Sequence, residues 1–65
     1  MNEAIQRALE TNGMASELAR HFGITRAAVT HWRTSRIPAE RVLEVERITG
    51  VSRHDLRPDI YPRDA

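Results

Sequence analysis

The sequence predicts one small all-α domain, spanning residues 1–65, with four helices and a short fifth helical turn. Apolar residues recur at helical spacing in four successive segments, and glycine, proline or small polar residues separate those segments. A chain of 65 residues is long enough for a single domain, and a domain of this size buries only about 60% of its unfolded surface. We therefore expect a compact helical domain with a small core.

The first two helices are expected at about residues 3–11 and 14–21. Their inner faces are the apolar positions Ala4, Ile5, Ala8 and Leu9, and then Ala15, Leu18, Ala19 and Phe22. Asn2 is placed to cap the first helix, and the turn-forming residues up to Gly13 stop it. Gly23 is expected to end the second helix, because glycine adopts a positive φ without steric cost.

The third helix is expected to start after Thr25, whose side-chain oxygen can accept a hydrogen bond from an N–H group of the first turn. Its inner face is formed by Ala28, Val29 and Trp32. The polar pair Thr34 and Ser35 marks its end.

The fourth helix is expected at about residues 38–49. Pro38 suits a first helical position, because its missing N–H would have no partner there. Gly50 suits a left-handed C-terminal cap, on which Val51 can pack. The apolar positions of this segment are Ala39, Val42, Leu43, Val45 and Ile48. They also alternate in part, so a β-strand is the alternative, but the proline start and the glycine stop favour the helix.

A short helical turn is expected at residues 53–57, followed by a C-terminal tail at residues 58–65. Ser52 and Asp55 have the spacing of a capping box, with Asp in place of the usual Glu or Gln. Three apolar side chains follow: Leu56, Ile60 and Tyr61. They either fold back onto the domain or meet a partner; with the fourth helix they are candidates for a dimer surface, although core packing is the better interpretation of Leu56.

The second and third helices together have the pattern of a helix-turn-helix, at about residues 14–34. The residues that carry it are Ala19, Gly23, Ile24, Val29 and Trp32. The alanine lets two helices cross closely, the glycine makes the tight turn, and the three larger residues anchor the corner and the third helix. Core packing is therefore preferred over base stacking for Trp32. The opposite face of the third helix stays free, and the major groove of DNA is wide enough to admit it.

The charge distribution supports a nucleic-acid partner. The net charge is only +1, but the stretch from Leu18 to Ala39 has no acidic residue. It contains four arginines: Arg20, Arg26, Arg33 and Arg36. Such a local basic patch is typical of a nucleic-acid surface, with a solvated face as the alternative. The low net charge argues against a nonspecific architectural protein, whose affinity comes from neutralising phosphates. Arg20 itself is expected to be a surface side chain or an intramolecular partner of Glu17 or another acid.

The helix-turn-helix at residues 15–33 resembles that of phage Cro and repressor proteins. The segments IPAER at 37–41, ERITGVSR at 46–53 and LRPDIYP at 56–62 extend the resemblance to the Cro/YdaS family of small phage and prophage regulators. The resemblance implies a lambda-repressor-like fold and binding to a palindromic operator as a Cro-like repressor, as a homodimer at least on DNA. Cro-like proteins differ in their second half, so a helical first half with a β-hairpin second half is the alternative fold.

Eight residues are predicted to contact double-stranded DNA. The base-reading set is Thr25, Arg26, Ala27, Thr30 and His31. The backbone-contacting set is Ser16, Arg33 and Arg36. Arg26 leads the first set, because arginine pairs in bidentate fashion with guanine. Its alternatives are a phosphate contact or a solvated side chain. The start of the second helix is expected to add free N–H groups that favour phosphate.

Other classes are less well supported. The chain has no cysteine, and its three histidines lack the spacing of a metal site, so we predict no metal or cofactor. No nucleophile–base signature or phosphate loop predicts an enzyme, so we expect no catalytic residues. No signal peptide or membrane-spanning stretch is evident, and a cytoplasmic protein of a bacterial or phage-infected cell is expected. The main alternative function is an antitoxin or adaptor that binds a protein partner, such as a toxin.

Overall fold

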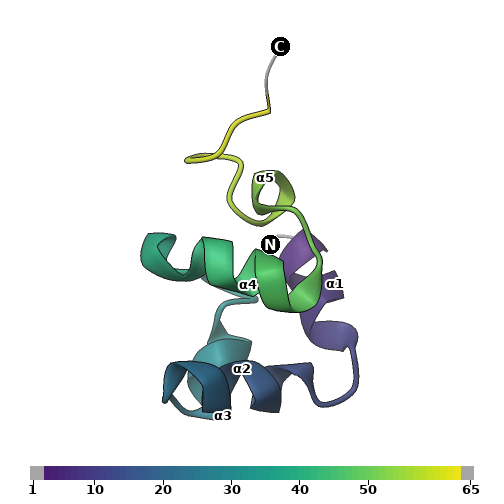
Figure 1. Ribbon diagram of the computed structural model, residues 1–65, viewed down its shortest axis with the longest axis vertical. Coiled ribbons are helices and arrows are strands. Elements are labelled where there is room, and N and C mark those ends of the chain that lie inside the picture. Colours follow the sequence, from purple (N-terminus) through teal and green to yellow (C-terminus); the bar gives the residue numbers. More distant parts are fainter. Residues whose placement is uncertain (1–2, 64–65) are drawn as a thin grey trace.

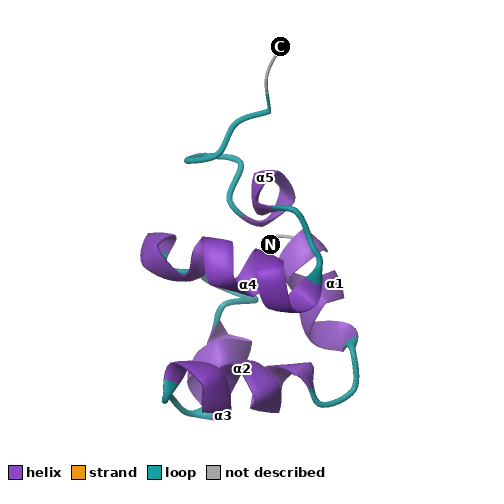
Figure 2. Ribbon diagram, in the orientation of Figure 1, coloured by secondary structure: helices purple, strands orange, loops and turns teal. Residues whose placement is uncertain are grey.

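The computed structural model describes residues 3–63, and all regular secondary structure in that range is helical, with loops and turns between the helices (Figure 2). The elements are α1 (Glu3–Glu10), α2 (Met14–Phe22), α3 (Arg26–His31), the 3-10 turn η1 (Ala39–Arg41), α4 (Val42–Thr49) and α5 (Arg53–Leu56). The prediction of an all-α domain is confirmed, and within the described residues neither the strand nor the β-hairpin alternative is present. The predicted cap Asn2 and the last two residues of the predicted tail lie outside the described range.

The helices lie in successive levels along an elongated domain of 36 × 20 × 18 Å (Figure 1). Helices α2 and α3 occupy one end, α4 and α1 lie across the middle, and α5 with the tail occupies the other end (Figure 1). Helix α4 contacts α2 on one side and α5 on the other. The element predicted to enter DNA is therefore far from the C-terminal tail.

One hydrophobic core joins these levels. Its buried residues are Ala4, Ile5, Ala8, Leu9, Ala15, Leu18, Ala19, Val29, Trp32, Ile37, Val42, Val45 and Leu56. The burial of Val29 and Trp32 confirms that they anchor α3 from beneath, and Phe22 meets the Trp32 ring edge-on at 6.1 Å between centroids. The burial of Leu56 confirms its predicted role in the core.

The fourth helix differs from its prediction in two ways. Its first turn is the separate 3-10 turn η1, and the regular α-helix begins only at Val42. Ala39 and Leu43, predicted on the inner face, are exposed, because α4 is covered only along the narrower row of Val42 and Val45. Gly50 has φ 77° and caps the helix as predicted, and Val51 packs against the core.

Smaller differences concern the ends of the other helices. Helix α3 ends at His31, earlier than predicted, and the chain then forms turns. In these turns the hydroxyls of Thr34 and Ser35 donate to the His31 carbonyl. Ser52 caps α5 by accepting from the His54 N–H, while the Asp55 carboxylate accepts from Arg63 instead of completing the predicted capping box.

The tail folds back through an arginine that the sequence analysis did not single out. Arg57 is buried, and its Nη1 donates to the Ile37 carbonyl at 2.6 Å. Its Nε and Nη2 form a fork on the Asp59 carboxylate at 2.9 and 2.7 Å. Tyr61 packs against the core, whereas Ile60 is 40% exposed. The tail up to this point is thus tied to the loop before α4.

Candidate nucleic-acid interface

Helices α2 and α3 meet at the sharp turn that the sequence predicted. Gly23 has φ 68° and donates its N–H to the Ala19 carbonyl, and the next N–H, of Ile24, donates to the same oxygen at 3.0 Å. Thr25 then caps α3, because its Oγ1 accepts from the Ala28 N–H at 3.1 Å. This turn fixes the direction of α3, whose inner side is held by Val29.

The exposed side of α3 presents two rows of predicted site residues. Arg26, Thr30 and Arg33 follow one another at i, i+4 and i+7 and line a hollow beside the start of α2. Ala27 and His31 are exposed, and neither lines that hollow. The eight predicted residues thus do not form one uniform surface; α3 offers a row next to α2 and a row away from it.

We call the first of these features the α2 hollow. It has a volume of about 180 Å³ and is lined by Leu9, Glu10, Thr11, Asn12, Gly13, Ala15, Ser16, Arg26, Thr30 and Arg33. It therefore brings together four of the eight predicted contacts: Ser16 from α2, Arg26 and Thr30 from α3, and Arg33 from the turn that follows α3. Glu10 is the acidic member of the lining, at the end of α1.

The start of α2 opens into this hollow with unpaired N–H groups. Its N-cap is Gly13, with φ 82°, and no side chain caps the helix. The Met14 N–H donates to the Thr11 carbonyl, and the Glu17 N–H donates to the Gly13 carbonyl. Within the described range, the N–H groups of Ala15 and Ser16 have no such partner. Free N–H groups at a helix start favour an anion, and here two arginines stand across from them.

Two threonines are partly committed to the backbone. The Thr30 hydroxyl donates to the carbonyls of Arg26 and Ala27, at 3.2 and 3.0 Å, so only its lone pairs and its methyl group remain for a ligand. Thr25 uses an Oγ1 lone pair for capping but keeps its hydroxyl proton. Base reading by either residue stays a prediction, with these limits on its chemistry.

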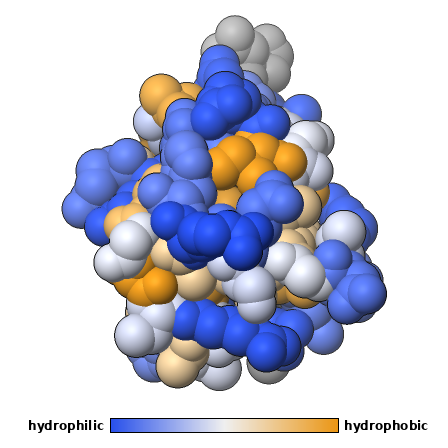
Figure 3. All heavy atoms as spheres, turned by 60° about the horizontal axis from the view of Figure 1, so that its bottom comes forward, coloured by the Kyte–Doolittle hydropathy of each residue, from blue (hydrophilic) through white to orange (hydrophobic). Residues whose placement is uncertain are grey.

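The arginines of the acid-free stretch differ in their pairing. Among the described residues, Arg20, Arg26 and Arg33 make no ion pair, and Arg20 is an exposed surface side chain, which is one of the two roles expected for it. Arg36 approaches the Asp59 carboxylate at 3.4 Å, and both side chains are exposed. An exposed pair of this length is weak, so Arg36 can exchange the carboxylate for a phosphate. The end of the molecule that carries α2 and α3 is mainly hydrophilic, with small separate hydrophobic patches (Figure 3).

The far end of α2 is held by a side-chain contact between His21 and Glu44 of α4. His21 Nε2 lies 2.9 Å from Glu44 Oε2, and Arg47 binds the same carboxylate from one turn along α4. The hydrogen bonds from the Arg47 guanidinium, together with the weaker effect of the His21 contact, lower the pKa of Glu44 to about 2. Glu44 is therefore an anion that links the end of α2 to α4 through His21.

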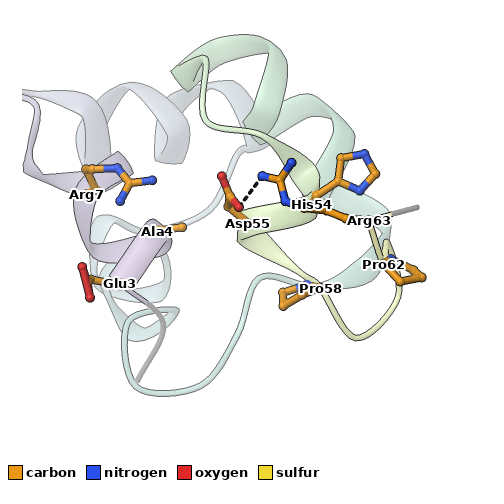
Figure 4. A pocket seen from close by; sticks show the side chains of 8 residues that line it. All are labelled: Glu3, Ala4, Arg7, His54, Asp55, Pro58, Pro62 and Arg63. Atoms are coloured by element: carbon orange, nitrogen blue, oxygen red, sulfur yellow. Dashed lines mark hydrogen bonds and ion pairs between the residues drawn. The ribbon is translucent and has the colours of Figure 1, made fainter. Parts of the chain in front are cut away.

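A second and larger hollow lies at the opposite end, between α1, α5 and the tail. It has a volume of about 600 Å³ and is lined by Glu3, Ala4, Arg7, His54, Asp55, Pro58, Pro62 and Arg63 (Figure 4). Arg63 donates to Asp55 at 2.6 Å, and the Arg63 hydrogen bond lowers the pKa of Asp55 below its usual range. His54 Nδ1 lies 2.9 Å from the Tyr61 carbonyl. Within this lining, Asp55, Arg63 and His54 are thus occupied in fixing the tail.

Two further features of the described residues concern metal binding and membrane crossing. Within residues 3–63, no three His, Asp or Glu side chains converge as metal ligands would. No helix in that range combines the length and the apolar character needed to cross a membrane.

Comparison with known proteins gives one match. The family model described as bacterial toxin YdaS matches residues 5–65, which is nearly the whole chain. This match confirms the family resemblance seen in the segments after the helix-turn-helix. No curated protein and no solved structure matches the chain.

Proposed function

The chain belongs to the bacterial toxin YdaS family, and we propose that it is a Cro-like transcriptional regulator that binds a palindromic operator in double-stranded DNA. The observation that carries this proposal is the α2 hollow, where the uncapped start of α2 faces Arg26 at the start of α3 and Arg33 in the turn after it. A DNA phosphate fits this combination of free N–H groups and cations. A backbone anchor there would place α3 along the major groove.

The two rows of α3 then take different tasks. The row next to α2, which is Arg26, Thr30 and Arg33, lies closest to the proposed phosphate. The row of Ala27 and His31 faces outward without a described partner. Arg26 stands at the first turn of α3, so its long side chain can reach either the phosphate or a guanine edge. Base readout remains our assignment for Arg26, with Arg33 and Ser16 on the backbone.

Selection of binding sites from random duplex DNA, followed by titration of the selected site at several salt concentrations, tests the proposal. We expect a short palindrome that is bound much more tightly than scrambled DNA. Arg26→Ala should cost about 1–3 kcal/mol at the selected site and relax the preference at one base pair, whereas Arg33→Ala and Arg36→Ala should weaken binding to all sequences about equally. Arg7→Ala is the matched control, since Arg7 lies by the hollow at the opposite end.

A protein partner from a toxin–antitoxin pair is the second candidate, and the family's description as a toxin favours it. On this hypothesis the helical domain binds another protein instead of, or in addition to, DNA. Failure to enrich any DNA sequence, with only weak and salt-sensitive binding, would refute the regulator proposal and favour this one.

A further inference from the structure

The outward side of α4 has a feature that its amphipathic pattern does not explain. Leu43 is 53% exposed and is one of two large hydrophobic side chains that the described structure leaves exposed. Glu40, in η1, and Arg47 are also exposed. Their spacing of three and four residues from Leu43 places them on the same side of the helix. We call these three residues the α4 outer stripe.

The stripe is complementary to itself. In an antiparallel arrangement of two copies around a two-fold axis, Leu43 meets the Leu43 of the second copy at the centre. Glu40 of each copy then faces Arg47 of the other, because the two charges flank Leu43 at nearly equal distances along the helix. Glu40 makes no ion pair among the described residues, and Arg47 is held in place by Glu44. In the two-fold arrangement, the unpaired Glu40 of one copy would therefore lie opposite Arg47 of the other.

The position of α4 in the fold allows such a pair to bind one DNA duplex. Helix α4 lies across the long axis of the molecule, with α2 and α3 toward one end and α5 toward the other (Figure 1). Helices α2 and α5 cover the two sides of α4 that face along the long axis of the molecule. The α4 outer stripe therefore faces away from that axis. A two-fold axis parallel to the long axis, passing beside Leu43, then brings the α3 helices of both copies to the same end. Two half-sites of a palindrome need that arrangement.

We propose that the α4 outer stripe is the surface through which a second copy of this chain binds on adjacent half-sites. The inference rests on the proposed function, since it assigns the contact that makes operator binding dimeric. A stripe with a single large apolar side chain is smaller than the interfaces of stable dimers, which bury about 1,200–2,000 Å². The contact is therefore expected to form mainly on DNA, because binding to adjacent half-sites gives the two copies a high effective concentration for each other.

Two matched substitutions test the proposal. Leu43→Glu places like charges face to face on the two-fold axis, and Ile60→Glu makes the same change at the other exposed large hydrophobic residue. Binding is measured on DNA with one half-site and with two half-sites. We expect Leu43→Glu to keep its affinity for one half-site and to lose roughly ten-fold or more of the cooperativity on two. Ile60→Glu should behave as the unmodified chain.

A charge exchange gives an independent readout. Glu40→Arg alone should reduce the cooperativity, and adding Arg47→Glu in the same chain should restore part of it, because the pair between copies is re-formed with its signs exchanged. Since the chain has no cysteine, Leu43→Cys also provides a single thiol. A short thiol-reactive crosslinker should then yield a covalent dimer on DNA with two half-sites, and should yield none with Ile60→Cys.

The outcomes separate this inference from the proposed function. Specific binding to one half-site with undiminished cooperativity in Leu43→Glu would overturn the inference and leave the DNA-binding proposal standing. Loss of cooperativity in Ile60→Glu but not in Leu43→Glu would also overturn the inference, and would place the contact between copies on the C-terminal tail. If the unmodified chain binds neither DNA, the proposed function fails, and the dimer inference fails with it.

Discussion

Arg57→Met is expected to destabilise the domain by about 2 kcal/mol, mainly through one carbonyl group. The Arg57 side chain is 11% exposed, and its Nη1 donates to the Ile37 carbonyl at 2.6 Å. Ile37 is fully buried in the core, so little water can reach its backbone. Methionine keeps most of the apolar stem of arginine but offers no donor. The carbonyl then loses its partner, and a buried acceptor without one costs about 1–3 kcal/mol.

This loss is large for so small a domain. At roughly 0.05–0.15 kcal/mol per residue, the whole chain has about 3–10 kcal/mol of stability. In domains of this size each kcal/mol moves the Tm by about 4–8 °C, so we expect a decrease of roughly 8–16 °C in thermal unfolding followed by circular dichroism. Arg63→Met is the matched control, because the Arg63 side chain is 63% exposed where it pairs with Asp55. Equal Tm values for the two variants would refute the role assigned to the Ile37 carbonyl.

Two further predictions concern a helix cap and the acid limb of stability. Thr25→Ala removes the oxygen that accepts from the Ala28 N–H and should cost about 1 kcal/mol in urea unfolding. Thr25→Ser keeps that oxygen, so an equal loss there would count against the cap. The hydrogen bonds from Arg57 lower the pKa of Asp59 from its ordinary 3.8 to about 2. Because the folded pKa is depressed, the stability that Asp59 contributes is present above its ordinary pKa and is lost as the pH falls toward 2. Tm measured against pH should therefore decrease less steeply over this range in Asp59→Asn, and identical acid limbs would contradict the reasoning.

Local signals in the sequence were sufficient for the helices and for the turn between α2 and α3. Gly23 and Gly50 were identified because few other residues adopt a positive φ at low cost, and both have it in the structure. Thr25 was identified because an N-cap needs a side-chain oxygen next to the first turn. Trp32 was placed in the core by its spacing from Val29. Each of these features depends on residues within one or two turns of one another.

The composition of the candidate site was only partly predictable. The sequence indicated that α3 carries the exposed polar residues and that the start of α2 has free N–H groups. It could not show that Arg26, Thr30 and Arg33 form one row beside Gly13. The place of that row beside Gly13 depends on how α3 packs against α2, and this packing is set by core contacts between the helices.

The sequence by itself determined where the helices lie to within about a turn, where the chain turns and which family the chain resembles, because these properties reside in spacing and in local backbone preference. Only the tertiary structure decided which apolar residues are covered. Leu43 and Ala39 share the helical pattern of Val42 and Val45, yet α2 and α5 cover a strip of α4 too narrow to include them. Arg57 reads in the sequence as an ordinary surface cation. It is buried because folding brings the Ile37 carbonyl, twenty residues away, to its guanidinium, and no local pattern encodes such a distant partner.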